Sequence, residues 1–257
     1  MSPQCGNETF WTVLETELDR WTDEDRAATL WWRDDDAIAE TPALNRLLRL
    51  AEGTPLAIAA IPTHTNPSLR KATAQLKNIR ILQHGFSHTN HAPEGQKKSE
   101  FGPHRVLEVM AAEAVQGREK LSSIAEDSFC PIFVPPWNRI DADFTARLPD
   151  IGFTAVSVFG TAQGAAPPEP INVHIDLIDW RGSRKFVGED VALGALIDHL
   201  IKRRTGVCPV TEATGMMTHH LDHDEGTWRF VERLLDVTQT HPAARWISVD
   251  TLLEDRS

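Results

Sequence analysis

Hydrophobic and polar residues follow two alternating patterns along the chain. Short apolar runs of strand length occur at 28–33, 56–61, 79–83, 131–134, 154–158, 174–178, 215–218 and 245–249. Longer stretches with apolar residues three and four positions apart predict amphipathic helices at 42–51, 106–124, 191–203 and 227–237. Thr41 precedes the first of these helices as a candidate N-cap, and the acidic residues Asp224 and Glu225 begin the last.

This alternation of strands with helices is typical of α/β folds with a parallel sheet. Eight candidate strands in a chain of 257 residues predict a distorted β/α barrel of seven or eight strands. An open doubly wound sheet is the alternative, but the glycine-rich phosphate loop that usually follows the first strand of such folds does not occur. We expect a single domain over residues 1–257, in which residues 1–27 form an N-terminal helical extension.

Composition and charge limit the classes of partner. Hydrophobic residues make up 41% of the chain, which is enough to bury a core of barrel size. The chain has 37 acidic residues against 26 lysines and arginines, which leaves a formal charge of −11. Because this charge repels phosphate backbones and anionic lipids, we expect no nucleic-acid partner, and a strongly anionic small substrate is slightly disfavoured.

The sequence also bears on the compartment. The first residues form neither the basic head nor the apolar stretch of a secretory signal, and no window reaches the roughly 18 apolar residues of a membrane-spanning helix. These observations predict a cytoplasmic protein without membrane insertion. Cys5, Cys130 and Cys208 lie far apart and form no CxxC pair, so neither a disulfide framework nor a thiolate zinc site is expected.

The polar residues with the most chemical content follow predicted strands. Asp34, Asp35 and Asp36 come after the first strand, and their mutual repulsion must be offset by a cation or by protonation. His84 and His88 come after the third strand, and two imidazoles with a carboxylate suit zinc and its neighbours in the transition series. Such a ligand set leaves coordination positions open for water, as in catalytic metal sites.

Two further groups follow the fourth and sixth strands. Pro135 and Pro136 stiffen the backbone and remove two amide donors, so the N–H of Trp137 becomes a fixed donor that could stabilise an oxyanion. Alternation along the sixth strand places either Asp176 or Asp179 toward the same region. A rigid turn and an ion pair at a strand end are the plainer explanations of these two groups.

Three histidines follow the seventh strand, at positions 219, 220 and 223, beside Asp222 and Asp224. A histidine at the barrel mouth that is oriented by a carboxylate could act as a general acid or base. A cluster of surface histidines before a helix is the alternative.

In their order along the chain, these residues resemble the five motifs of the NodB-type polysaccharide deacetylases, carbohydrate esterase family 4 (CE4). The five matching stretches are Trp32-Arg33-Asp34-Asp35, His84 with His88, Val134-Pro135-Pro136-Trp137, Asp176 with Asp179-Trp180, and Met217-Thr218-His219. The resemblance implies a metal-dependent deacetylase on a distorted β/α barrel. It assigns Asp34 as the base, Asp35, His84 and His88 as metal ligands, and His219 as the acid.

Departures from the family pattern leave some assignments open. Asp36 stands where the family usually has glycine, so a shifted register with Asp35 as base and Asp36 as ligand is the alternative. Val134 replaces the arginine that usually orients the base, and Arg139 or Arg33 can substitute for it. His220 and His223 compete with His219 for the role of the acid. A divergent branch is indicated, so a polymeric substrate is not assumed.

The resulting hypothesis is a hydrolase that uses a divalent metal, with zinc first among the candidates, to remove an N-acetyl or similar acyl group from a sugar. A small N-acylated sugar or a glycan precursor is the expected partner, with Trp137 and Trp180 as flat faces for a sugar ring. One alternative is a metal hydrolase of a non-sugar amide or a phosphoester, which a basic cluster near the site would favour. The other is an inactive barrel that binds a glycan. The sequence shows only scattered lysines and arginines and leaves the oligomeric state undetermined.

Overall fold

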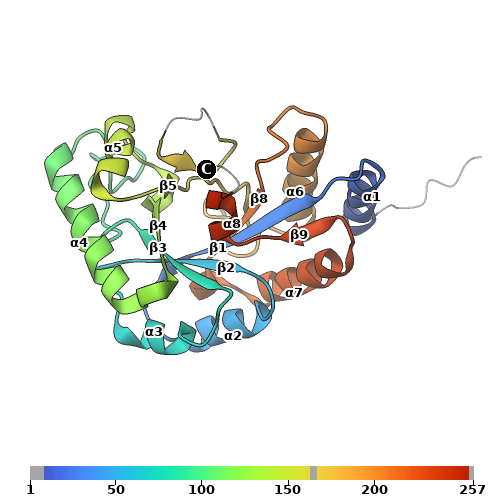
Figure 1. Ribbon diagram of the computed structural model, residues 1–257, viewed down its shortest axis with the longest axis horizontal. Helices are drawn as coiled ribbons and strands as arrows, with labels where there is room; N and C mark the ends of the chain where they lie inside the picture. Colours follow the sequence, from blue (N-terminus) through green and yellow to red (C-terminus); the bar gives the residue numbers. More distant parts are fainter. Residues whose placement is uncertain (1–8, 163–166, 255–257) are drawn as a thin grey trace, which may run out of the picture.

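A parallel β-sheet lies at the centre of the computed structural model, which describes residues 9–162 and 167–254 (Figure 1). Its strand order is β6-β5-β4-β3-β2-β1-β8-β7, and β9 pairs with the first residues of β1. The strands are β1 Ala28–Ala37, β2 Leu56–Ala60, β3 Ile79–His84, β4 Phe129–Val134, β5 Ala155–Val156, β6 Glu169–Pro170, β7 Ile175–Asp176, β8 Thr214–Thr218 and β9 Ala244–Trp246.

The segment 169–176 connects the two ends of the sheet. Its first half pairs with β5, through bonds such as Ile171 N–H to the Val156 carbonyl at 2.9 Å. Its second half pairs with β8, where the His174 N–H donates to the Gly215 carbonyl at 2.7 Å. Hydrogen bonding therefore continues from β5 to β8 through one stretch of chain. The predicted distorted β/α barrel is confirmed.

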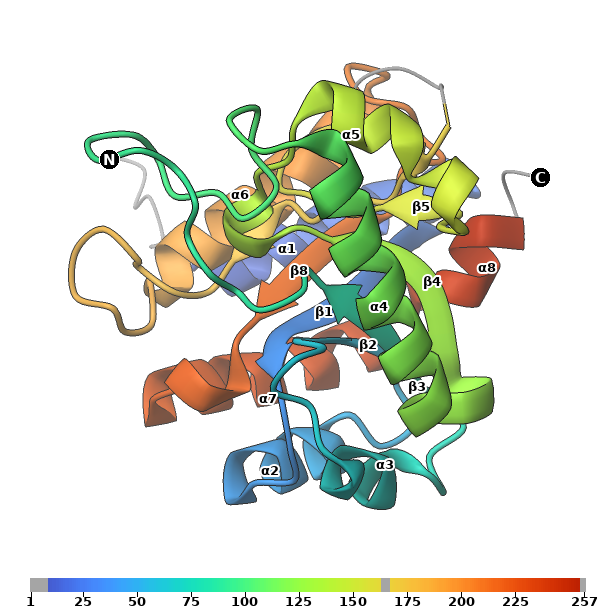
Figure 2. The same ribbon diagram turned by 90° about the vertical axis from the view of Figure 1, so that its left-hand side faces the viewer.

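Helices surround the sheet (Figures 1 and 2). They are α1 Phe10–Asp23, α2 Pro42–Leu50, α3 Pro67–Thr73, α4 Leu107–Ala125, α5 Ala142–Arg147, α6 Glu189–Arg204, α7 Glu225–Thr240 and α8 Val249–Glu254. Short 3₁₀ turns occur at Glu126–Ser128, Pro136–Asn138, Pro149–Ile151 and His220–Asp222. Both predicted caps form, since Thr41 accepts from Leu44 N–H and Asp224 accepts from Thr227 N–H. No helix of the described residues is long and apolar enough to span a membrane.

The predicted N-terminal extension contains α1, which packs on α6. The face of α1 that is buried presents Trp11, Leu14, Leu18 and Trp21, and Glu17 forms an ion pair with Arg204 of α6 at 2.7 Å. The helix is thus part of the helical layer that covers the sheet. Residues 1–8, which include Cys5, lie outside the described residues.

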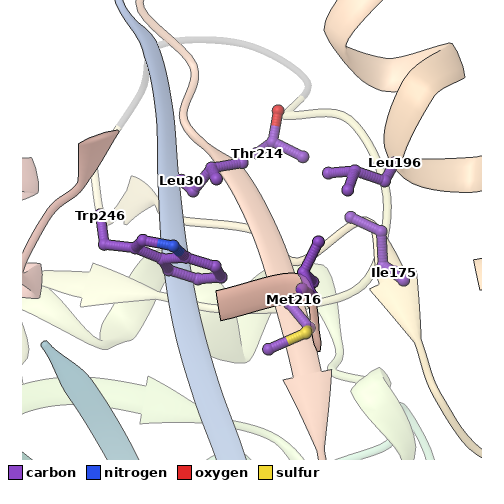
Figure 3. Close-up of a pocket in the computed structure, with 7 residues that line it drawn as sticks. Leu30, Ile175, Leu196, Thr214, Met216 and Trp246 are labelled. Atoms are coloured by element: carbon purple, nitrogen blue, oxygen red, sulfur yellow. The ribbon is translucent and has the colours of Figure 1, made fainter. Parts of the chain in front are cut away.

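Apolar side chains fill the space between the sheet and the helices. Figure 3 shows one small cavity there, where Leu30, Ile175 and Met216 from three strands meet Leu196 of α6 and the indole of Trp246. A second apolar cluster lies inside the barrel and includes Trp31 and Leu252 of α8. The cavity in Figure 3 is part of the core between sheet and helices, because apolar side chains form nearly all of its lining.

Two strand ends lie three or more residues away from their predicted positions. The first strand does not end at Arg33 but continues to Ala37, so the acidic run is part of β1. Residues 245–249 were expected to form a strand, but β9 ends at Trp246 and α8 begins at Val249. The Ser248 hydroxyl accepts from the Thr251 N–H at 3.1 Å, which stabilises a helix start at this point.

Candidate active site

The carboxyl ends of the strands open onto a cleft with a volume of about 1200 Å³. Residues from β1, β3 and β8 and from the segments after β4 and β7 line it, among them Asp35, Asp36, His84, Trp137, Asp176 and His219. The described residues include seven non-glycine residues with a positive φ, and five of them line the cleft: Asp36, His88, Trp137, Asn138 and Arg184. Such strained conformations gather at functional sites in proteins.

A local irregularity in β1 determines which aspartates face the cleft. The register of β1 with β2 shifts between Asp34 and Ala37, and Asp36 has a φ of 68°. Regular alternation would place Asp34 and Asp36 on the same face. The bulge instead turns Asp36 into the cleft together with Asp35, while Asp34 faces the opposite side.

Asp36, His84 and His88 form a three-residue cluster that fits a metal ion. The Asp36 Oδ1 lies 3.1 Å from His84 Nε2 and 3.3 Å from His88 Nε2. The Nδ1 of His84 lies 3.0 Å from the Val134 carbonyl, which can only accept, so this nitrogen carries the proton and Nε2 presents a lone pair. The buried Oδ1 of Asp36 has no hydrogen-bond donor. An oxygen and two imidazole nitrogens that converge in this way could hold a metal ion between them.

The electrostatics of Asp36 and His88 agree with this arrangement. Burial raises the pKa of Asp36, but the neighbouring His84 outweighs burial and holds the pKa below its ordinary range. Burial lowers the pKa of His84, yet Asp36 and Asp35 reverse this and raise it. Burial and the neighbouring His84 lower the pKa of His88. Asp36 is therefore ionised and His88 is neutral at pH 7, as metal ligands must be.

Asp35 is held by Arg33 on the same strand. The Nε of Arg33 donates to Asp35 Oδ1 at 2.8 Å and its Nη2 donates to Oδ2 at 2.9 Å. Both side chains are buried, and Arg33 also donates to Ser157 Oγ and to Asn138 Oδ1. Between the two arginines considered from the sequence, Arg33 is the one that binds this carboxylate. Arg139 instead donates to the Lys98 carbonyl.

Asp34 and His220 form a separate buried pair outside the cleft. The Asp34 carboxylate accepts from Thr218 Oγ1 at 2.6 Å and from the His220 N–H at 3.0 Å, and its other oxygen contacts His220 Nδ1. Burial raises the pKa of Asp34, but His220 more than reverses this effect and lowers it. The structure therefore does not bring Asp34 to the place of a base that water can reach, nor His220 to that of an accessible acid.

His219 also lines the cleft. Its ring packs edge-on against Trp180 at a centroid distance of 4.7 Å, and its buried Nδ1 has no hydrogen-bond partner. Trp180 is held in turn by Asp176, whose Oδ2 accepts from the indole N–H at 2.9 Å. Burial raises the pKa of Asp176, and the neighbouring His219 opposes this rise. Asp179 also lines the cleft, but its carboxylate accepts from backbone N–H groups of its own turn.

The turn after β4 has a rigid backbone. Pro136 begins a 3₁₀ turn in which Trp137 and Asn138 both have left-handed φ values, of 57° and 54°. Within the turn, the Asn138 N–H donates to the Pro135 carbonyl and the Arg139 N–H donates to the Pro136 carbonyl. The Trp137 ring packs on His88 at 4.5 Å, so the turn is fixed against the metal-ligand side of the cleft.

The loop between His84 and His88 depends on Glu100, which no sequence motif indicated. The buried Glu100 carboxylate accepts from the Phe86 and Ser87 N–H groups at 3.1 and 2.7 Å. At Gly85 the φ is 56°, and a Cβ there would lie 2.1 Å from Glu100 Oε2. Glycine is therefore required at this position. Glu100 lies 14 residues beyond Phe86, too far for a short motif to reveal it.

A second cluster of possible ligands comprises His174, His199 and Glu212, all buried. The Nδ1 of His174 accepts from the Gly215 N–H at 2.9 Å, so in a neutral ring the proton lies on Nε2, 3.2 Å from Glu212 Oε1. That nitrogen then donates to the carboxylate and offers no lone pair to a metal. The cluster is better explained as a hydrogen-bonded part of the core.

Comparisons with known proteins show similarity at the level of the fold. No family model and no curated protein matches the sequence. The chain is similar to a Streptococcus mutans CE4 esterase with 10% identity and a TM-score of 0.57 over 91% of this chain and 89% of that one. It is also similar to the family 4 carbohydrate esterase from Streptomyces lividans in complex with acetate, with 14% identity and a TM-score of 0.54 over 82% of this chain and 88% of that one. A third similar structure is a mutant CE4 family pseudoenzyme with restored enzymatic activity, with 12% identity and a TM-score of 0.56 over 88% of this chain and 68% of that one. The predicted resemblance is thus confirmed at the level of the fold.

Proposed function

Because the chain has the fold of the CE4 polysaccharide deacetylases, we propose that it is a metal-dependent hydrolase that removes an N-acetyl or similar acyl group from a sugar or glycan precursor. The observation that carries the proposal is the convergence of Asp36 Oδ1 on the imidazoles of His84 and His88, next to the buried Asp35–Arg33 pair. Similar structures support it, since one is a family 4 carbohydrate esterase in complex with acetate.

Asp36, His84 and His88 would hold the metal, and zinc is the first candidate because of the ligand set. This is the shifted register, in which Asp36 rather than Asp35 is the carboxylate ligand. A divalent ion bound there would polarise the acyl carbonyl and lower the pKa of water.

The chain's own residues supply the proton transfers and the charge stabilisation. Asp35, oriented by Arg33, accepts the proton of the attacking water. The Trp137 N–H, in a turn fixed by Pro136, donates to the developing oxyanion. His219 gives a proton to the departing amine. Asp176 is a positioning residue that orients Trp180 against His219.

The shape of the cleft supports a sugar substrate. Its volume of about 1200 Å³ exceeds the range of about 300–1,000 Å³ of small-molecule pockets, so it has room for more than one ring. Trp137 and Trp180 both line the cleft, beside His88 and His219 respectively, and aromatic faces suit the apolar faces of sugar rings.

The test is a metal titration with a matched pair of variants. Metal-free protein is titrated with Zn²⁺, and acetate release from N-acetylglucosamine and its dimer is measured; turnover should reach its maximum at one ion per chain. His88→Ala should lose the bound ion and turnover. His91→Ala should keep both, because His91 is exposed and does not belong to the metal-ligand cluster. Full turnover of the His88→Ala variant would contradict the proposal. Inorganic phosphate released from 4-nitrophenyl phosphate would favour the phosphoester alternative.

A further inference from the structure

Five cationic side chains gather around the cleft, which we call the cation ring: Lys97, Lys98, Arg139, Arg181 and Arg184. They come from three loops, which follow β3, β4 and β7. Among the described residues, none of the five forms an ion pair. In a chain with a formal charge of −11, this concentration of unpaired positive charge needs an explanation.

The loops that carry the cation ring are fixed in place. Arg139 Nη1 donates to the Lys98 carbonyl at 2.8 Å, which joins the loop after β3 to the loop after β4. The Asp179 carboxylate accepts from the N–H groups of Gly182 and Ser183 at 3.0 and 2.8 Å, which holds the turn between Arg181 and Arg184. A ligand that binds the cation ring therefore meets a preorganised surface.

Two cations of the ring lie one aromatic side chain away from the proposed catalytic groups. Lys98 Nζ lies 5.8 Å from the centre of the Trp137 ring, and Trp137 packs on His88. The Arg184 guanidinium lies 5.3 Å from the Trp180 ring, which packs on His219. An anionic group separated from the acyl amide by about one sugar ring would meet a cation beside either tryptophan.

The carboxylates around the cleft do not neutralise the cation ring. Asp35 is paired with Arg33, and Asp36 with the histidine ligands. Asp176, Asp179 and Asp222 are the acidic residues left in the lining, three against the five cations of the ring, so the cations are in excess. Several lysine and arginine donors around one opening suit the multiple oxygens and charge of a phosphate better than a single carboxylate.

We propose that the substrate of this cleft is an N-acylated sugar that carries a phosphate group, and that the cation ring binds this phosphate. The inference rests on the proposed function and narrows its substrate class. It also corrects the expectation that an anionic substrate is disfavoured, because net charge says nothing about where loops place individual lysines and arginines.

The experiment compares sugars that differ in charge. The probes are N-acetylglucosamine, its 1-phosphate, its 6-phosphate, the uridine diphosphate sugar and N-acetylmuramic acid, each with zinc-loaded protein. We expect kcat/KM for at least one phosphorylated probe to exceed that for N-acetylglucosamine by about tenfold or more, and this ratio to fall as salt rises from about 50 to 500 mM. The best phosphorylated probe distinguishes a terminal phosphate from a bridging diphosphate.

A pair of double variants assigns the effect to the cation ring. Lys98→Gln with Arg184→Gln should lower kcat/KM for the phosphorylated probe about tenfold more than for N-acetylglucosamine. Lys77→Gln with Arg245→Gln removes the same charge from exposed positions outside the cleft and should change the ratio less than twofold. Calorimetry of the same phosphorylated probe with metal-free protein gives a second readout, because the phosphate then has no zinc ion to bind. The Lys98→Gln, Arg184→Gln variant should bind the probe about tenfold more weakly in this measurement.

The outcomes separate this inference from the proposed function. Deacetylation of all probes at similar kcat/KM would overturn the inference and leave the proposed function intact. Equal preference for N-acetylmuramic acid would overturn the assignment to phosphate. Release of inorganic phosphate without acetate would contradict the proposed deacetylation. If no probe is turned over, the affinities of the phosphorylated probes decide. Equal affinities for the two double variants would overturn the inference.

Discussion

Arg33 and Asp35 form a bidentate ion pair within a single strand, with both side chains buried inside the barrel mouth. Residues two positions apart on a strand share a face, so the arginine reaches the carboxylate without any other element. In the family pattern an arginine from the motif after β4 has this task, and here Val134 occupies that position. The pair supplies the orientation of the proposed base from its own strand.

Replacement of Arg33 by Met should leave an uncompensated buried carboxylate. We expect a loss of about 3 kcal/mol in the free energy of unfolding and a fall in kcat of about 100-fold, with zinc retained. Denaturant titration, steady-state kinetics and metal analysis measure these effects. The double variant Arg33→Met with Asp35→Asn should be more stable than Arg33→Met alone. If it is less stable, the carboxylate is not held by Arg33.

Replacement of Asp34 by Asn should affect stability and leave metal binding intact. Asp34 is fully buried and accepts from Thr218 and His220 outside the cleft, so the amide loses a charge-assisted contact. We expect a loss of about 2 kcal/mol in unfolding free energy, with one zinc ion still bound per chain. Metal analysis of the purified variant checks this, and loss of zinc would return Asp34 to the metal site.

The fold and the positions of the motifs could be predicted from the sequence, because both depend on local periodicity. Apolar runs alternate with amphipathic stretches, and the polar groups follow the runs at their carboxyl ends. The choice among Asp34, Asp35 and Asp36 could not be predicted. It depends on a shift in strand register and on a left-handed φ at Asp36, which alternation along the sequence does not reveal.

The cation ring and Glu100 could not be predicted for a different reason. Lys98, Arg139 and Arg184 lie far apart in the sequence, and only the order of the strands brings their loops to one opening. Glu100 contacts backbone N–H groups near Gly85, and backbone contacts impose no recognisable pattern on neighbouring side chains. Both features arise from tertiary structure.

Replacement of His219 by Ala should impair substrates according to their leaving group. An amine needs a proton to depart, whereas 4-nitrophenolate leaves without one. We therefore expect kcat for an N-acetylated sugar to fall about 100-fold or more, and kcat for 4-nitrophenyl acetate to fall less than fivefold. Equal losses with both substrates would show that His219 does not act as the acid.

The buried His199 should make the protein less stable in mild acid. Burial lowers its pKa to about 2, with help from the charges of His174 and Arg203. Below pH 6.5 the unfolded chain therefore binds a proton at His199 that the folded chain does not bind. The contribution of neutral His199 to stability is complete above pH 6.5 and decreases as the pH is lowered. His199→Gln should reduce the slope of unfolding free energy between pH 4.5 and 6 by about 1.4 kcal/mol per pH unit. Identical slopes in the two proteins would contradict the prediction.

The central claim is that Asp35 acts as the base and the adjacent Asp36 as the metal ligand. Parallel measurement of zinc content and turnover in Asp35→Asn and Asp36→Asn tests this claim most directly. Asp35→Asn should bind one zinc ion per chain and lose turnover, because the ligand set is intact and the base is absent. Asp36→Asn should lose both, since its carboxylate completes the cluster with His84 and His88. Loss of zinc from Asp35→Asn, with zinc retained by Asp36→Asn, would contradict the account.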